Sequence, residues 1–197
     1  MTLRWTCALA LAAALPLPLA AQDARLTARL DSSTALQVQA LLDSARGERL
    51  PGEPLVQKAL EGSAKGADGA RIVAAVRALY GNLRVARSAL GSGATEPELV
   101  AGVATLRAGG TPDMLATLRR LRPAQSVAIP LGVLTDLVAR GAPLTSAWRS
   151  VEGLARSGGS DAQFLAIRDP AGQRGNPAPP VQPLHPAGVP AAGAPQQ

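Results

Sequence analysis

Apolar residues recur at intervals of three and four from about Ser33 to Arg168, which is the spacing of amphipathic helices. The longest such run predicts a helix over residues 69–90. Its apolar positions are separated by steps of four and three residues, so they form a narrow stripe that is typical of a helix packed against a neighbour. The stripe contains Ile72, Val76, Leu79, Leu83, Ala86 and Leu90.

Shorter helices are predicted on both sides of this one. Two of them begin with the spacing of a capping box, one at Thr95 and Glu98 and the other at Ser160 and Gln163. The predicted ranges are 34–46, 53–65, 96–108, 112–121, 130–140, 143–157 and 161–168.

Proline and glycine mark further helix boundaries. Pro112 and Pro143 are expected at the first position of a helix, where the missing amide hydrogen costs little. A glycine just past the last turn often ends a helix in the left-handed conformation. The glycines expected to do so are Gly47, Gly66, Gly110, Gly141 and Gly159.

The helical segments repeat weakly along the chain. Residues 53–90 align with residues 96–121 at offsets of 42 to 44 positions, and residues 130–157 provide a third copy. A single helical hairpin cannot cover its own apolar face, so successive hairpins are expected to stack. We therefore expect an all-α protein of short helical hairpins joined by glycine-containing turns, arranged as a small α-solenoid or an irregular helix bundle. Chance similarity among amphipathic helices is the alternative explanation of the match.

The first residues are predicted to be a targeting signal rather than part of the fold. Residues 1–21 combine a charged start, an apolar run interrupted by Pro16 and Pro18, and a small-residue end, which is typical of a secretory signal peptide. We expect cleavage after Ala21, a periplasmic or secreted product and no transmembrane segment in the mature chain. An uncleaved anchor is the alternative. Residues 22–32 then lead into a helical domain at 33–168.

The last residues have a different composition. Residues 169–197 contain eight prolines and lack the apolar periodicity of the preceding chain. Such a segment cannot bury a core, so we predict a disordered Pro-, Ala- and Gly-rich tail that is partly polyproline II. A spacer, a recognition peptide and a segment without a selected role are all open interpretations.

The net charge changes this picture little. The chain has 20 Lys and Arg against 14 Asp and Glu, and removal of Arg4 with the signal peptide lowers the net charge from +6 to +5. Only Lys58 and Lys65 are lysines, and alanine, glycine and proline are abundant, which is typical of a GC-rich bacterial genome. Basicity alone therefore does not indicate a nucleic-acid partner.

The residue types needed for most site chemistry are scarce. Cys7 lies in the predicted signal peptide and His185 in the predicted tail, so no zinc site, thiol chemistry or Ser-His-Asp triad is expected. Ser63 and Lys65 have the residue types of a serine–lysine catalytic pair. They are better explained by a helix end, where Glu61 and Lys65 have the spacing of an ion pair and Lys65 complements the helix dipole. Glu61 could be the lone acid of an envelope glycan hydrolase, but its neighbours Gly62, Ser63 and Ala64 are not the aromatic and polar residues that bind sugar in such enzymes. No cofactor is expected.

A glycine-containing stretch resembles the start of a nucleotide-binding loop. Residues 91–96 read GSGATE, but the sixth position is glutamate and no strand is predicted before it. We interpret the stretch as a loop between two helices.

Two groups of arginines are the sharpest basic features. Arg77, Arg84 and Arg87 are predicted on one flank of the long helix, beside Tyr80, and form a candidate face for an anionic partner. A solvated helix face is the alternative interpretation. The second group, which complements the dipole of a helix end, contains Arg119, Arg120 and Arg122.

These patterns favour an exported, non-enzymatic helical interaction or scaffold module of the bacterial envelope. Its expected partner is an envelope protein or an anionic envelope polymer. A periplasmic binder of a lipid or small apolar ligand between helices is the first alternative, and an envelope glycan hydrolase is the second.

Overall fold

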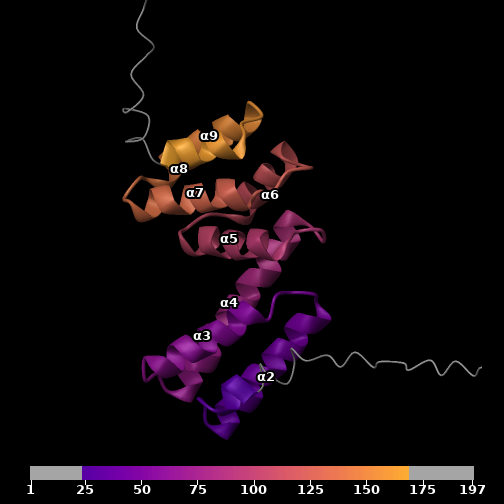
Figure 1. Cartoon of the computed structure of the whole chain (residues 1–197), viewed down its shortest axis with the longest axis vertical. Coiled ribbons are helices and arrows are strands. Elements are labelled where there is room, and N and C mark those ends of the chain that lie inside the picture. The colour runs from indigo at the N-terminus through magenta and orange to yellow at the C-terminus, as the bar shows by residue number, and fades with distance from the viewer. Residues whose placement is uncertain (1–23, 169–197) are drawn as a thin grey trace, which may run out of the picture.

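A computed structural model describes residues 24–168, so the predicted signal peptide, the start of the lead-in and the predicted tail lie outside the described residues. The regular structure of the described chain is entirely helical (Figure 1), which confirms the all-α prediction. One helical turn at residues 24–27 precedes the longer helices. These are α2 (Ser32–Gly47), α3 (Glu53–Ala64), α4 (Gly69–Leu90), α5 (Glu96–Arg107), α6 (Pro112–Leu121), α7 (Ala128–Ala139), α8 (Leu144–Arg156) and α9 (Asp161–Arg168).

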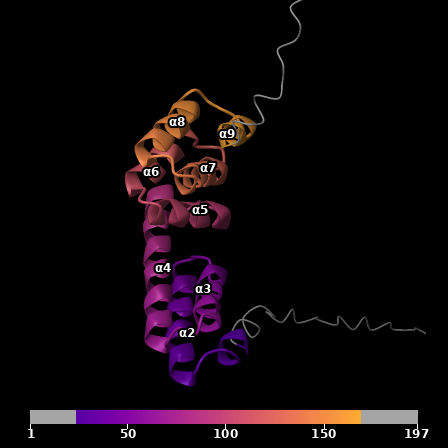
Figure 2. The same cartoon turned by 90° about the vertical axis from the view of Figure 1, so that its left-hand side faces the viewer.

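The long helix α4 joins two parts of the molecule. Helices α2 and α3 pack against it on the N-terminal side, and α5 and α6 pack against its C-terminal end. Beyond α4 the helices form two layers, with α5, α7 and α9 in one layer and α6 and α8 continuing from α4 in the other (Figure 2). The result is an elongated stack of helices.

This arrangement corrects one detail of the predicted hairpins. Helices α3 and α4 pack together as expected, and so do α7 and α8. Helices α5 and α6, however, make their main contacts with other helices: α5 with α4 and α7, and α6 with α4 and α8. The physical reason is that each of these short helices buries its apolar face against the neighbouring hairpin.

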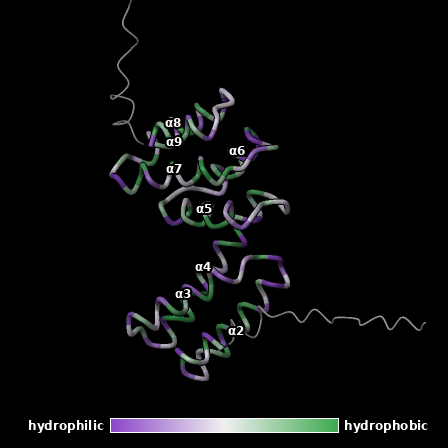
Figure 3. The backbone as a smooth tube through the Cα atoms, in the orientation of Figure 1, coloured by the Kyte–Doolittle hydropathy of each residue, from purple (hydrophilic) through white to green (hydrophobic). Residues whose placement is uncertain are grey.

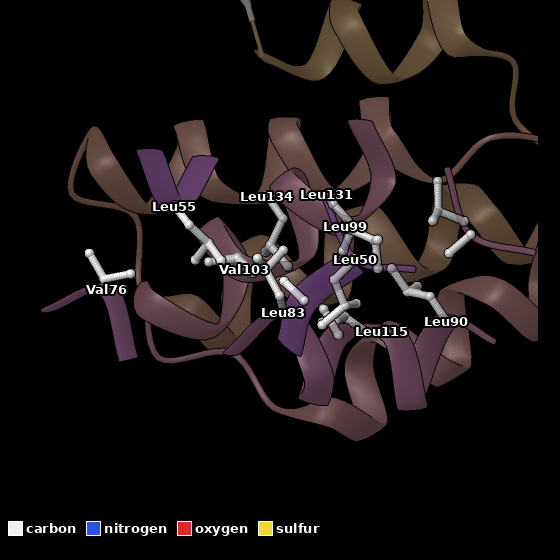
Figure 4. Packing of buried hydrophobic residues seen from close by; sticks show 14 of the residues in the cluster. Leu50, Leu55, Val76, Leu83, Leu90, Leu99, Val103, Leu115, Leu131 and Leu134 are labelled. Atoms are coloured by element: carbon white, nitrogen blue, oxygen red, sulfur yellow. The ribbon is translucent and has the colours of Figure 1, made fainter. Parts of the chain in front are cut away.

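The core runs continuously through the stack. Each helix carries both hydrophobic and hydrophilic residues (Figure 3). The apolar side chains of neighbouring helices pack together in the interior of the stack (Figure 4). Leucine, valine and alanine make up most of the buried set, and Phe164 is its only aromatic member among the described residues. On α4 the predicted stripe is buried except for Leu79, which is half-buried, and Val73 is buried beside it.

Several helices are followed by a glycine with a positive φ, but this glycine is not always the one predicted. Gly66 and Gly141 adopt positive φ values of 69° and 92°, as expected. At the two Gly-Gly pairs, 109–110 and 158–159, the first glycine takes this conformation, with φ of 93° at Gly109 and 76° at Gly158. The prediction that Gly110 and Gly159 are left-handed is therefore wrong.

The second glycine of each pair has another role. The amide of Gly110 donates to the carbonyl of Thr105, and the amide of Gly159 donates to the carbonyl of Leu154, both at 2.9 Å. These bonds close Schellman motifs. A Cβ atom at either glycine would lie 2.9 Å from the same carbonyl oxygen, so the turn requires glycine there as well.

The prediction for Gly47 is also wrong. Gly47 is the last residue of α2, and the left-handed position after it is occupied by Arg49, with φ of 55°. The amide of Leu50 then donates to the carbonyl of Ala45 at 2.8 Å. Leu50 is buried, so the turn is held by an apolar contact as well as by its hydrogen bonds.

The predicted helix starts are mostly confirmed. Thr95 and Glu98 form a capping box, and the amide of Ser160 donates to Gln163 Oε1 at 2.8 Å. Pro112 is the first residue of α6. Pro143 instead precedes α8 as its capping residue, one position earlier than predicted.

Candidate functional site

A buried carboxylate joins three elements near the start of α5. Glu98 Oε2 accepts a hydrogen bond from the Thr95 amide at 2.8 Å, and Oε1 accepts one from the Val127 amide at 3.0 Å. Arg119 Nη2 also donates to Oε1. The Glu98 side chain thus fixes the start of α7 and the end of α6 against α5.

The surroundings of Glu98 favour its charged form. Burial alone would raise its pKa, but the hydrogen bonds from the two amides and from Arg119 outweigh burial and lower the pKa from 4.5 to about 2. The carboxylate is therefore ionised at neutral pH, and its hydrogen bonds fix the helices rather than donate a proton.

A buried guanidinium fixes α9 in a similar way. Arg122 Nη1 donates to the carbonyl of Gly159 at 2.6 Å, and Nη2 pairs with Asp161 Oδ1 at 2.6 Å. Its Nε donates to the carbonyl of Ser126 at 3.2 Å, and its Cζ lies 5.0 Å from the ring centroid of Phe164. One arginine thus ties the segment before α7 to the start of α9.

Helices α5 and α7 lie side by side in parallel. Glu98 near the start of α5 contacts Val127 before α7, and Thr105 farther along α5 lies opposite Thr135, with 3.3 Å between the two Oγ1 atoms. The same polar pair bonds to the backbone of its own helices, because the two hydroxyls also donate to the carbonyls of Ala101 and Leu131. These contacts set the register of the two helices.

The three helices fixed in this way border an apolar groove, which we call the α5/α7/α9 groove. Its volume is about 450 Å³. Val100 on α5 and Leu165 on α9 are 44% and 40% exposed, whereas Val133 on α7 is buried. The groove is lined by Pro97, Val100, Ala101, Ala104, Ala128, Ile129, Gly132, Val133, Asp136, Leu165 and Arg168.

The charged residues of this groove lie at one end. Arg168 Nη1 lies 3.5 Å from Asp136 Oδ2, so the two charges pair with each other. The rest of the lining consists of small or branched apolar residues and Gly132, where a Cβ atom would meet no other atom within 4 Å. The groove is therefore suited to an apolar occupant.

Two of the arginines predicted on the flank of α4 make structural contacts. Arg87 is half-buried and donates to the backbone carbonyls of Arg49, Ser92 and Ala94 at 2.6 to 3.1 Å. Arg84 pairs with Glu48 at 2.9 Å. These two side chains tie α4 to the neighbouring loops.

Glu48 also reaches Tyr80, the aromatic residue of this flank. Tyr80 Oη donates to Glu48 Oε1 at 2.7 Å, and this bond raises the pKa of Tyr80. Arg77 is exposed and makes no ion pair within residues 24–168. The structure thus brings Arg84 and Tyr80 together around an acid and leaves Arg77 pointing to solvent.

The second arginine group is mainly structural. Arg119 and Arg122 hold the Glu98 and Gly159 sites described above, whereas Arg120 is exposed and bonds to Thr117 Oγ1 at 2.8 Å. Besides lying near the end of α6, where the sequence predicts a role in complementing the helix dipole, Arg119 and Arg122 make long-range contacts that the local sequence does not show.

The candidate acid Glu61 lies in an exposed cluster of charges. It pairs with Lys58 at 2.8 Å and with Lys65, and these hydrogen bonds lower its pKa to about 2. A general acid at neutral pH needs the opposite shift. Ser63 Oγ donates to the carbonyl of Arg29 at 2.7 Å.

Residues 91–95 connect α4 to α5 as a loop between helices, as interpreted from the sequence. Within residues 24–168 no group of three or more His, Cys, Asp and Glu side chains is placed to hold a metal ion. None of the described helices combines the length and the apolar character needed to cross a membrane.

The α5/α7/α9 groove has no signal in the local sequence. Val100 was visible only as an apolar position aligned with Val56, which is fully buried on α3. The exposure of Val100 and Leu165 depends on how α5 and α9 pack against α7, and these contacts join segments that are distant in sequence. Comparison of the chain with protein-family models, curated proteins and solved structures gave no match.

Proposed function

We propose that this protein is an exported, non-enzymatic helical interaction module of the bacterial envelope. Its docking surface is the α5/α7/α9 groove, and its partner contributes an extended, uncharged apolar segment. One observation carries the proposal: Val100 and Leu165 expose apolar surface on opposite borders of a groove whose helices are fixed by Glu98 and Arg122. A groove held in place before binding loses little conformational entropy when it is filled.

The lining supports the chemistry of this partner. The polar side chains of the groove, Asp136 and Arg168, already pair with each other. A charged group placed on the remaining apolar lining would lose its hydration without gaining a partner, which is unfavourable. An uncharged segment with small or branched apolar side chains fits this surface best.

Export is supported by the sequence of residues 1–21. Intact-mass analysis of protein recovered from the bacterial envelope tests it. A chain that begins at Gln22 supports export with cleavage, and a chain that retains Trp5 contradicts it.

The non-enzymatic part of the proposal rests on how the charged residues are used. Glu98 and Arg122 are held in buried structural contacts, and Glu61 has a pKa too low for a general acid at neutral pH. The second alternative, an envelope glycan hydrolase, has no other candidate acid from the sequence.

Site-specific photo-cross-linking tests the docking surface. A benzoylphenylalanine residue replaces Val100 in the groove, or Val85 on α4 as a matched control, because Val85 is a helical valine of similar exposure, 39%, outside the groove. We expect cross-links from position 100 to uncharged, apolar peptides, identified by mass spectrometry, and none from position 85. Equal cross-linking from the two positions, or cross-links to charged peptides, contradicts the proposal.

The alternative function as a binder of a small apolar ligand is favoured by a different hollow. It lies between the turn at residues 24–27 and α2, has a volume of about 350 Å³, and includes Leu26, Leu30 and Leu36. Leu36 is 72% exposed. Retention of a lipid through purification, lost in a Leu36→Asp variant, would support this alternative over the groove.

A further inference from the structure

The described chain ends at the α5/α7/α9 groove. Arg168, the last residue of α9, lines the groove and pairs with Asp136 there. The carbonyl of Arg168 accepts a hydrogen bond from Arg140 Nη1 at 3.2 Å, so the direction in which the chain leaves α9 is set by α7. The 29 residues that follow therefore start at one end of the groove.

The groove is short enough for one segment of these residues. It follows α7 from Asp136 back to Ala128, a distance of about 12 Å at 1.5 Å per residue. A polyproline II segment rises about 3.1 Å per residue, so four or five residues cover this length. Residues 169–176 reach at most about 29 Å when extended, which is enough to turn back to any part of the groove.

The chemistry of residues 177–184 complements the lining. Their sequence, PAPPVQPL, carries no charge and offers Val181 and Leu184 as apolar side chains. Half of these residues are prolines, which have no backbone N–H to be buried without an acceptor. This matters in a groove whose lining is apolar away from Asp136 and Arg168.

Size and attachment favour the chain's own segment over a second copy. A stable interface between two folded copies buries about 800 Å² on each copy, far more than a groove about 12 Å long can provide, so the groove is suited to an extended segment and not to a folded surface. A tethered segment needs much less contact area, because a short flexible linker gives an effective concentration of about millimolar.

We infer that residues 177–184 occupy the α5/α7/α9 groove of their own chain, with Val181 and Leu184 against Val100, Val133 and Leu165. The inference rests on the proposed function, since it names the first occupant of the same docking surface. A partner segment then has to displace the chain's own segment, which makes binding dependent on competition.

Paramagnetic relaxation in the full chain tests this inference. Cys7→Ser removes the single native cysteine, and Ala187→Cys places one nitroxide label just beyond the segment. The methyl signals of Val100 and Val133 report on the groove, and those of Val38 on α2, at the other end of the stack, serve as the control. We expect broadening at Val100 and Val133 that persists on dilution, with none at Val38.

Two variants identify the contact. Gly132→Leu fills the groove at a position with free space, and Gly153→Leu is its matched control, because Gly153 on α8 also has no atom within 4 Å of a Cβ position and lies outside the groove. We expect loss of broadening in Gly132→Leu only. Leu184→Asp should cause the same loss without changing the described helices, so the test does not depend on the folding of Gly132→Leu.

The opposite results overturn the inference. Unbroadened Val100 and Val133, or broadening that survives both Gly132→Leu and Leu184→Asp, shows that residues 177–184 do not occupy the groove. Broadening that falls on dilution assigns the contact to another copy and also overturns it. If broadening is absent while the Val100 cross-link to an uncharged partner peptide persists, the inference fails and the proposed function stands. If both are absent, both fail.

Discussion

Glu98 Oε1 accepts a hydrogen bond from the backbone amide of Val127 at 3.0 Å, across 29 residues of sequence. Val127 precedes the first residue of α7, so a side chain of α5 caps the neighbouring helix. The same carboxylate caps its own helix at Thr95 and pairs with Arg119. One buried acid therefore sets the position of α5 and α7, two of the three helices that form the groove.

Replacement of this acid should strongly destabilise the fold. Glu98→Gln removes the negative charge and leaves the half-buried Arg119 guanidinium without its ion-pair partner, and we expect a loss of about 3 kcal/mol in the free energy of unfolding. Glu96→Gln is the control in the same helical turn, because Glu96 is exposed and only its interaction with the helix dipole, less than about 1 kcal/mol, is lost. Urea denaturation at pH 7 measures both, and equal losses would show that Glu98 has no special role.

The stabilising effect of Glu98 should depend on pH. Its pKa is about 2 in the folded protein, against 4.5 without these contacts. A lowered pKa gives stability that is fully present above pH 4.5 and is lost as the pH falls toward 2. The difference in unfolding free energy between the native chain and Glu98→Gln should therefore shrink over this range. A constant difference between pH 5 and pH 2.5 would contradict the assignment of the charge.

Arg122 should be as important to α9 as Glu98 is to α7. Arg122→Ala leaves the Gly159 carbonyl and Asp161 without their partner and removes the contact with Phe164, so we expect a loss of about 3–5 kcal/mol. Arg120→Ala removes an exposed arginine two residues earlier and should change stability by less than about 0.5 kcal/mol. Thermal unfolding followed by circular dichroism compares the two, and a stable Arg122→Ala protein would refute the role of Arg122.

The arginines of α4 should separate into structural and exposed residues. Arg87→Ala removes three hydrogen bonds to backbone carbonyls, and we expect a loss of about 1–3 kcal/mol. Arg77→Ala should change stability by less than about 0.5 kcal/mol, because Arg77 is exposed. If the two variants unfold at the same denaturant concentration, the contacts of Arg87 contribute nothing measurable.

The turn after α2 offers a substitution that should stabilise the protein. Arg49 holds a φ of 55° that favours glycine, so Arg49→Gly should relieve up to about 1 kcal/mol of backbone strain. The hydrogen bond from Arg87 is kept, because it goes to the backbone carbonyl of residue 49. A raised midpoint of denaturation supports this, and a lowered midpoint shows that the Arg49 side chain makes a stabilising contact.

The sequence was sufficient for the helices because their signals are local. The apolar spacing of α4 and the capping box at Thr95 and Glu98 each lie within one helix, and both are confirmed. In the glycine pairs the sequence alone does not show which glycine is left-handed. The choice depends on the hydrogen bond from Gly110 to Thr105, which places Gly109 at the turn.

The groove could not be predicted because its parts are distant in sequence. Glu98 was recognisable as a capping residue, but its bond to Val127 depends on how α7 packs on α5. Arg122 was recognisable only as one of three neighbouring cations, and its burial follows from the position of α9. No local pattern distinguishes the exposed Val100 from the buried Val103, which lies three residues and about five-sixths of a turn away on the same helix.

The central claim is that the α5/α7/α9 groove receives an uncharged apolar segment. The most direct measurement is the yield of cross-linking from benzoylphenylalanine at position 100 to such segments in two backgrounds, Gly132→Leu and Gly153→Leu. Both positions have free space around a Cβ atom, but only Gly132 lies in the groove. We predict that the cross-link is lost in Gly132→Leu and kept in Gly153→Leu, and equal yields in the two variants would contradict the claim.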